Sequence, residues 1–593
     1  MTTLYQELRA LGDALPDAKA YHQNTRFPWL LALDRAGRPL GPLQPLEETQ
    51  TSKTGKARTV RGVSHFTPSL KRTAGVSPLL PHDGIGYVLG WCDSSSKPDR
   101  VAQSHDAWAA LVRDWATTIG ATDPIAQALL LFLGHTETVL RPAEWTSKDN
   151  VLIQIAGTNA HDAATLVPFW TRHVEGAKSA GGQGTCLVCG HAGVLVDTLP
   201  QPVQGPLIPG GQASGIAPIS VNSSAFGYNL SMGLAHTPIC TNCARAIPAA
   251  LNHLLSDSAR TERGVTTTTT WWVTGDQPWD ANPLLDEPQP EQVKALHESV
   301  CGATLSKSVD MARWNGLVLA ANGPRMIVRD WTNLPLIDVQ RNVVQWFDDV
   351  HLVPRFLDGR PYTPLRVLAM ATGRHDGQSN RYLFLSDKAG HHFHEAAEIL
   401  RGCALKGDAP PRALLVHVIA RITSDQHIDD PRAALLRLIL RRTYQRGTLM
   451  PGLDDQCTDP CYVAGRLFAI YGDMQYAAAT MGGGTAPNST FADKYLAGAI
   501  SDPRTAITAG EKQAAAWLNK LRRGEKAYFF QRDLDAVMAL LQPSAPLPTR
   551  ASLDEQAMFI LGYHHQRANT QHLRDEAKQR RSLAHDSNDT TTH

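Results

Sequence analysis

Two short cysteine pairs constrain the fold of this chain more than any other feature of its sequence. Cys186 and Cys189 stand in the stretch TCLVCG, and Cys240 and Cys243 stand in ICTNC. This spacing lets both thiolates of a pair reach adjacent corners of one tetrahedron around a metal ion. Gly190 suits the tight turn that must follow the first pair. Together the pairs predict one zinc site with four cysteine ligands.

Such a site would be structural, because four thiolates fill the coordination shell of zinc and leave no position for an activated water molecule. The two pairs are separated by 50 residues, which exceeds the roughly 15–20 residues of a compact zinc ribbon. We therefore expect zinc to hold the base of an elaborated loop, within an insertion at 180–250. Free or buried thiols, or a redox pair, are the alternative interpretations of these cysteines.

Two other classes of protein also fit paired cysteines. A zinc-containing His-Asn-His nuclease needs an adjacent Asp-His or His-His pair, and His191, Asn222, Asn229 and His236 between the cysteine pairs provide none. A zinc-stabilised DNA-binding regulator is the second alternative. The chain contains no HExxH, GxSxG or phosphate-binding glycine motif. The sequence therefore favours a non-catalytic protein over the common enzyme classes.

The composition is that of a globular chain with several domains. Its 593 residues carry a formal net charge of +1, so a nucleic-acid partner must be held by a local patch. The N-terminal stretch lacks the apolar core of a signal peptide, and no apolar run approaches the ~18–20 residues of a membrane span. Nine cysteines are too few for a disulfide scaffold in a chain of this length. We expect a cytoplasmic protein without a membrane partner.

A basic segment without Asp or Glu extends over 49–82. Its Ser, Thr and Gly residues add hydrogen-bond donors to the cations, and residues 50–61 have the composition of a loop. Uncompensated cations beside such donors are typical of contact with a nucleic-acid backbone, so we predict DNA binding here. A solvated basic loop is the alternative. The cations are Lys53, Lys56, Arg58, Arg61, Lys71 and Arg72.

Apolar periodicity predicts an α+β fold, with a mixed α/β region first and a mostly α-helical bundle after it. We expect strands at 151–157 and 264–275, a hairpin at 315–331, and helices at 105–118, 124–134 and 337–350. The predicted domains are an α/β region at 1–355 that includes the insertion, a helical connecting region at 356–449, a helical bundle at 450–570 and a polar disordered tail at 571–593.

Several stretches together resemble the large subunit of the type I-C CRISPR surveillance complex, Cascade. The likeness extends over most of the chain, and the segments KRTAGV, YVLG and QAMFILGYHHQR are its most specific parts. In chain order the stretches are SLKRTAGVSPLLPHDGIGYVLGW, TCLVCG, SGIAPISVNSSAFGYN, TTTTTWWVTG, NGLVLAANGPRMIVRDW, DPCYVAGRLFAIYGDMQ and SLDEQAMFILGYHHQR.

The resemblance implies a non-catalytic subunit that recognises the protospacer-adjacent motif in double-stranded target DNA, assists unwinding and stabilises the R-loop. In RNA-guided complexes base pairing reads the target, while protein reads the short flanking motif. The implied partners are the crRNA-containing backbone subunits, the subunit that binds the crRNA 5′ end, and a recruited helicase-nuclease. A small subunit made from the C-terminal region, by an internal start at Met450 or Met474, is also implied.

Pattern and resemblance together predict DNA contacts in three segments, with ordinary loop hydrogen bonds or a solvated helix face as the alternatives. The basic segment should follow duplex phosphates, with Lys71 and Arg72 foremost. The loop at 210–224 should approach a minor groove, because short polar side chains on a Gly-rich backbone suit it. Its predicted readers are Gln212, Ser214, Asn222 and Ser223. The helical contacts are Arg432, Arg437, Arg441, Arg442, Lys520, Arg522 and Arg523.

Two positions depart from the family pattern. The family carries Asn before the Tyr-Val-Leu segment, where this chain has PHDGIGY. Asp83 cannot donate a hydrogen bond to a base edge, so we expect a different motif preference or a different reading loop. The family also has Cys-Leu-Val-Thr-Gly at the first cysteine pair. The zinc site would therefore belong to this branch and would not be essential to the family's function.

Overall fold

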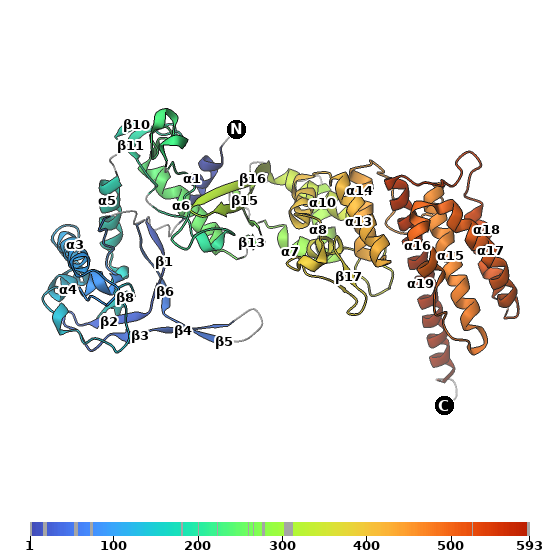
Figure 1. Ribbon diagram of the computed structural model, residues 1–593, viewed down its shortest axis with the longest axis horizontal. Helices are drawn as coiled ribbons and strands as arrows, with labels where there is room; N and C mark the ends of the chain where they lie inside the picture. The colour runs from blue at the N-terminus through green and yellow to red at the C-terminus, as the bar shows by residue number, and fades with distance from the viewer. Residues whose placement is uncertain are drawn as a thin grey trace. The chain divides into compact units, whose positions relative to one another are not determined.

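The computed structural model divides the chain into two compact units (Figure 1). Unit 1 comprises Met1–Thr274 with Asn315–Asn333, and unit 2 comprises Gly275–Trp314 with Leu334–His593. The fold is mixed α/β with helices in the C-terminal part, which confirms the predicted class. The structure describes residues 3–15, 21–51, 57–70, 75–178, 182–199, 201–221, 223–258, 260–264, 266–274, 279–301, 312–524 and 526–589.

The first sheet of unit 1 has β2 (Trp29–Leu33) and β8 (Asn150–Ile155) paired in parallel. Alternate side chains of β2 are buried, as expected for a strand with one face on a core. Helices α3 (Pro98–Thr117) and α4 (Pro124–Phe132) contribute Trp108, Trp115 and Phe132 to this core. The other elements here are β3 (Gln44–Pro45), β7 (Asp83–Gly84), β9 (Thr158–Asn159), α2 (Ile85–Val88) and α5 (Leu166–Lys178). The strand at 151–157 and both predicted helices are confirmed.

Two antiparallel ribbons extend this part of unit 1. β1 (His22–Phe27) pairs with β6 (Val63–Pro68), and β4 (Glu47–Thr51) pairs with β5 (Ala57–Arg61). The loop expected at 50–61 is therefore wrong for the described residues, which form the arms of a hairpin (Figure 1). Its composition looks like a loop because a ribbon outside a core needs no apolar face. Its β-branched residues and ladder hydrogen bonds still favour the strand.

A second pair of sheets builds the rest of unit 1. A three-stranded sheet contains β10 (Gln183–Thr185), β11 (Ala192–Val196) and β12 (Ile239–Cys240), and α6 (Thr241–Ser256) follows it. α1 (Leu4–Ala14) packs on α6. The larger sheet has the order β13 (Thr261–Arg263), β14 (Thr268–Thr274), β15 (Arg313–Asn322) and β16 (Arg325–Pro335). This confirms the hairpin at 315–331 and the strand at 264–275, whose Trp271 and Trp272 are both buried.

Unit 2 is built almost wholly of helices. The first group contains α7 (Asn282–Asp286), α8 (Pro290–Cys301), α10 (Leu336–Val350), α11 (Leu365–Ala371), α12 (Ala396–Lys406), α13 (Arg412–Asp425), α14 (Asp430–Arg442) and the short pair β17 (His375–Asp376) and β18 (Arg381–Tyr382). The helix predicted at 337–350 is confirmed as α10. It belongs to unit 2 because it packs on α8, α12 and α14.

The C-terminal helices form a bundle around α15 (Pro460–Thr480). Glycines allow α15 and the last helix to touch backbone to backbone. A Cβ atom on Gly465 would lie 2.0 Å from the Phe559 oxygen, and one on Gly562 would lie 2.1 Å from the Tyr462 oxygen. The other helices are α16 (Phe491–Ser501), α17 (Pro503–Arg522), α18 (Ala527–Met538) and α19 (Leu553–Asp589).

The polar tail predicted to be disordered from residue 571 instead continues α19 as far as Asp589. Composition alone does not show the pairs that favour the helix. Arg574 reaches Asp473 of α15 at 3.0 Å, and Arg580 pairs with Glu576 one turn earlier. Within the described part of the chain, no helix combines the length and apolar character needed to cross a membrane.

Candidate metal centre and nucleic-acid interface

The sheet of β10, β11 and β12 brings the two cysteine pairs together. Cys186 and Cys189 lie in the turn between β10 and β11, and β11 pairs with β12 so that Leu195 stands opposite Cys240. Cys240 immediately precedes α6, and Cys243 lies in the first turn of that helix. Local sheet pairing therefore closes the long gap between the pairs.

The four Sγ atoms lie within 4.8 Å of one another. Those of Cys189 and Cys240 are 3.8 Å apart, which equals the separation of about 3.8 Å expected for tetrahedral zinc–sulfur bonds of about 2.3 Å. Cys186 and Cys243 are buried. The donor set and its spacing are compatible with zinc. Among the described residues, no other group of three or more His, Cys, Asp or Glu side chains is arranged to hold a metal.

The turn of the first pair has the backbone that the sequence predicted. Gly190 has φ +74°, a conformation that glycine adopts without strain, and its N–H donates to the Cys186 carbonyl at 2.9 Å. The Cys186 N–H donates to the His191 carbonyl, and the Leu187 N–H donates to Pro238. Pro238 lies just before β12, so this bond ties the first turn to the second pair.

Two thiols of the cluster have pKa values shifted in opposite directions. Burial opposes ionisation of Cys186, but N–H groups of Cys189, Cys240 and Val188 outweigh it and lower the pKa to about 7. Burial and the neighbouring thiols raise the pKa of Cys243. Arg9 of α1 is affected in turn. Its burial lowers the pKa, but charge on Cys243 and on Asp13 raises it more, so this guanidinium offsets negative charge at the cluster.

The Gly-rich stretch at 204–221, between the two cysteine pairs, packs closely on its own chain. A Cβ atom on Gly205 would lie 2.0 Å from the Gln212 oxygen, and one on Gly210, which has φ +81°, would lie 2.4 Å from the Ala321 oxygen. Gly323, in the turn between β15 and β16, donates through its N–H to Gly210. These glycines therefore allow the stretch to lie against the turn between β15 and β16.

The structure places most of the predicted groove readers. Gln212 is half-buried, its side chain donates to the Gly215 carbonyl at 3.1 Å, and its N–H donates to Gly323. Ser214 is exposed and Ser223 is half-buried. Asn222 lies outside the described residues. Ser214 is therefore the most accessible of the predicted readers that the structure describes.

In the basic segment, Arg61 is held at the base of the β4–β5 hairpin. Its guanidinium donates to Asp149 at 3.0 Å and lies 5.3 Å from the centre of the Trp29 ring, while its side chain remains 55% exposed. Arg58 lies in β5. Lys53, Lys56, Lys71 and Arg72 lie outside the described residues.

Asp83, singled out as a departure from the family pattern, is buried. Its carboxylate accepts hydrogen bonds from the N–H groups of Leu79 and Gly84. It therefore shapes the turn before α2. Because its oxygens are used inside the protein, the acid at this position does not reach a base edge.

The predicted helical contacts Arg437, Arg441 and Arg442 face the inside of unit 2. Arg437 is buried and donates to the carbonyls of Asp349 and Leu449, at 2.9 and 2.7 Å. Arg441 and Arg442 both donate to the Asp349 carboxylate, at 2.7 and 2.5 Å. These guanidinium groups join α14 to α10, and DNA contact would require exchanging those bonds.

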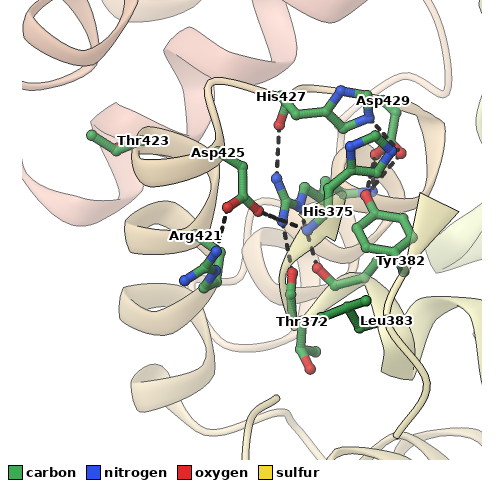
Figure 2. A network of polar contacts seen from close by, with 12 residues as sticks. Thr372, His375, Tyr382, Leu383, Arg421, Thr423, Asp425, His427 and Asp429 are labelled. Atoms are coloured by element: carbon green, nitrogen blue, oxygen red, sulfur yellow. Dashed lines mark hydrogen bonds and ion pairs between the residues drawn. The ribbon is translucent and has the colours of Figure 1, made fainter. Parts of the chain in front are cut away.

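Arg432, another predicted contact, is fully buried. It donates to the carbonyls of Gly373 and His427, at 2.8 and 3.0 Å, and pairs with Asp425. Figure 2 shows Asp425 facing Arg421, and His427 beside His375 and Asp429. Lys520, Arg522 and Arg523, at the end of α17, are exposed. Burial thus separates two groups of arginines and lysines that look alike in the sequence.

His375 and His427 stack with ring centres 3.6 Å apart. Tyr382 donates to both oxygens of Asp429, at 2.8 and 2.7 Å. Together with Arg432 and Asp425, these side chains form a network that we call the Arg432 network. Sequence reasoning missed it because its members come from separate segments of the chain. The only local signal was the acidic start of α14, where Asp429 caps the helix by accepting from the Arg432 N–H.

One family model matches residues 1–571, and its description is CRISPR-associated protein Cas_Csd1. No curated protein matches the chain. The matched range covers both units and includes the four cysteines, the basic segment and the C-terminal bundle. The chain therefore belongs to the Csd1 family of CRISPR-associated proteins, which is the large-subunit family of the type I-C Cascade complex.

Proposed function

We propose that this protein is the non-catalytic subunit of a cytoplasmic type I-C Cascade that recognises the protospacer-adjacent motif in duplex DNA. It also assists unwinding, stabilises the R-loop and offers the surface that recruits the helicase-nuclease. The observation that carries the proposal is the family match over 1–571. The basic segment without acidic residues supplies the charge that a DNA backbone requires.

The β4–β5 hairpin supports this assignment. In the sequence, Lys53 and Lys56 fall between its two strands. The base of the hairpin is fixed, because Arg61 pairs with Asp149 and Arg26 pairs with Glu48 at 3.2 Å. A fixed base lets a connection rich in cations meet DNA phosphates at a lower cost in conformational entropy.

We propose that zinc occupies the four-cysteine cluster and acts only on structure. Cys186, Cys189, Cys240 and Cys243 would hold it, and its charge would stabilise four thiolates that otherwise repel one another. The Gly-rich stretch lies between the two pairs in the sequence and contacts the turn between β15 and β16. Zinc would therefore fix where this stretch begins and ends, with Ser214 on its exposed side.

Substituting the hairpin cations tests the proposed DNA contact. We expect Lys53→Ala with Lys56→Ala to weaken binding of motif-bearing duplex by the assembled complex. The slope of log K against log salt should become shallower by about 0.9 for each lost phosphate contact, so by up to about 1.8. The same test applies to Lys71→Ala with Arg72→Ala, and binding is measured by fluorescence anisotropy over a salt series.

Lys97→Ala is the control, because Lys97 is an exposed lysine of unit 1 that precedes α3. If both double variants keep the affinity and the salt slope of the unsubstituted complex, the basic segment does not contact DNA. Motif-specific binding by the chain without any RNA would favour the zinc-stabilised regulator. Metal-dependent nicking abolished by changing His191 or His236 would favour the nuclease.

The positions of Met450 and Met474 support one of the two possible starts of the proposed small subunit. Met450 lies before α15, so a fragment that starts there contains α15 through α19 whole, whereas Met474 is buried inside α15. We propose Met450 as the start. Met450→Leu should abolish a separate C-terminal product in cells that express the gene, and Met474→Leu should leave it unchanged. Loss of the product only with Met474→Leu would reverse this choice.

A further inference from the structure

The first turn of α18 carries two aromatic side chains that are left in solvent. Tyr528 is 70% exposed and Phe529 is 57% exposed, although both belong to a helix packed on the bundle. Their ring centres are 5.8 Å apart with an interplanar angle of 74°. Ala527 and Leu534 of the same helix are buried, so α18 has its own core face and does not need these rings for packing.

Cations are frequent in the sequence on both sides of the two aromatic residues. Residues 520–532 contain five Lys or Arg and one acid, Glu525, which lies outside the described residues. The Arg532 guanidinium lies 5.8 Å from the centre of the Phe529 ring and also pairs with Asp533. The five cations, all of them exposed, are Lys520, Arg522, Arg523, Lys526 and Arg532.

We propose that this patch, defined as Tyr528 and Phe529 with the five cations of 520–532, binds single-stranded DNA by stacking unpaired bases on the rings and holding phosphates with the cations. Proteins that bind single strands combine a positive surface with exposed aromatic side chains, because every base has a face that stacks. A duplex keeps its bases stacked on one another and offers no free face to Tyr528 or Phe529.

The charge of the patch argues against a protein partner. The cores of protein–protein interfaces are depleted in charged residues and in Lys particularly, whereas the segment that carries these rings also contains the exposed Lys520 and Lys526. The choice of single-stranded DNA rests on the proposed function, since opening a DNA duplex leaves one displaced strand. RNA, an anionic membrane and a protein are the other occupants that the experiment must separate.

The test uses the full chain and a fluorescent oligo-dT of about 20 nucleotides, which exceeds the roughly 4–16 nucleotides that a single-strand-binding fold occupies. Tyr528→Ala with Phe529→Ala should weaken binding at least about tenfold, since stacking of one base contributes roughly that much. The salt slope should stay unchanged, because stacking releases no counterions. Arg522→Ala with Arg523→Ala should instead make the slope shallower by about 0.7 for each lost contact.

Two further variants keep the result interpretable. Tyr528→Trp with Phe529→Trp preserves stacking and should retain the affinity. Phe384→Ala removes an aromatic side chain that is 55% exposed and lies outside the C-terminal bundle, and it should have no effect. An unchanged affinity in the double alanine variant, or an equal loss with Phe384→Ala, would overturn the proposal.

Other probes decide among occupants. Tighter binding of oligo-U RNA with the same dependence on both rings would overturn the choice of DNA, and ring-dependent binding to anionic vesicles with no binding to oligo-dT would overturn a nucleic-acid site. Binding of motif-bearing duplex by the complex is measured in parallel. If the hairpin variants lose duplex binding while the ring variants keep it, duplex recognition does not depend on the patch. Failure of the patch proposal can then be told apart from failure of the proposed function.

Discussion

Cys186→Ser and Cys243→Ser are each expected to reduce bound zinc from about one ion per chain to almost none. Both residues are buried in the cluster of four thiols, and serine cannot supply a thiolate ligand. Because zinc binds the folded state, its loss should lower the free energy of unfolding of unit 1 by more than about 4 kcal/mol. Metal analysis after gel filtration gives the stoichiometry, and hydrogen exchange at β10–β12 and α6 gives the local stability.

The pH dependence provides a second measure of the same site. Cys186 has a pKa lowered to about 7, while the pKa of Cys240 and of Cys243 is raised. Zinc must displace a proton from each protonated thiol, so its affinity should fall as the pH is lowered. The two thiols with raised pKa values by themselves imply a change of at least roughly 100-fold per pH unit, which becomes steeper below the pKa of Cys186. Competition with a chromogenic chelator measures it.

Cys92→Ser is the matched control, since Cys92 is a half-buried cysteine of unit 1 that lies outside the cluster. Its thiol contacts the carbonyls of Asp93 and Ser96, and serine can donate to the same carbonyls. Zinc content and stability should therefore stay close to those of the unsubstituted chain. If Cys186→Ser retains a full equivalent of zinc, the four-cysteine site is wrong.

Arg432→Leu is expected to destabilise unit 2 by about 3–5 kcal/mol, the range for breaking a buried ion pair by removing one partner. The substitution leaves Asp425 without the guanidinium that it pairs with, and it leaves the carbonyls of Gly373 and His427 without a donor. The side chain of Arg432 is fully buried, so water cannot replace these bonds without opening the fold. Hydrogen exchange of α13 and α14 measures the loss.

The sign of the pH dependence follows from Asp425. Burial raises the pKa of this carboxyl, but the bonds from Arg432 and the His375 N–H outweigh burial and hold the pKa below its usual value. The pair therefore contributes stability above the unfolded pKa of about 3.9 and loses it as the pH falls through the folded pKa. The difference in stability between the unsubstituted chain and Asp425→Asn should shrink in that acidic range.

Arg341→Leu is the control for the Arg432 network, because Arg341 forms an exposed pair with Asp338 at 3.3 Å in α10. Exposed pairs contribute about 0–1 kcal/mol, so this variant should remain close to the unsubstituted chain. Equal stabilities of Arg432→Leu and Arg341→Leu would mean that the buried network contributes no more than an exposed pair.

Local patterns predicted much of the fold correctly. The spacing of apolar residues differs between strands and helices and can be read from consecutive residues. The hairpin at 315–331 and α10 could therefore be predicted from the sequence. The hairpin arms at 47–51 and 57–61 could not be predicted in this way, because a ribbon outside a core needs no apolar alternation. The extension of α19 did not follow either, since Arg574 depends on Asp473, a residue of another helix.

The cluster of four cysteines was predicted from the sequence itself, because cysteine chemistry and the spacing within each pair are local properties. The role of each arginine was decided only by the tertiary structure. Arg437 is buried, and Arg441 and Arg442 are half-buried, against α10, about 90 residues earlier, while Arg522 and Arg523 remain exposed. Helical periodicity indicates which residues share a face, but not what packs against that face. A buried charge needs partners from distant segments, and only the folded chain brings them together.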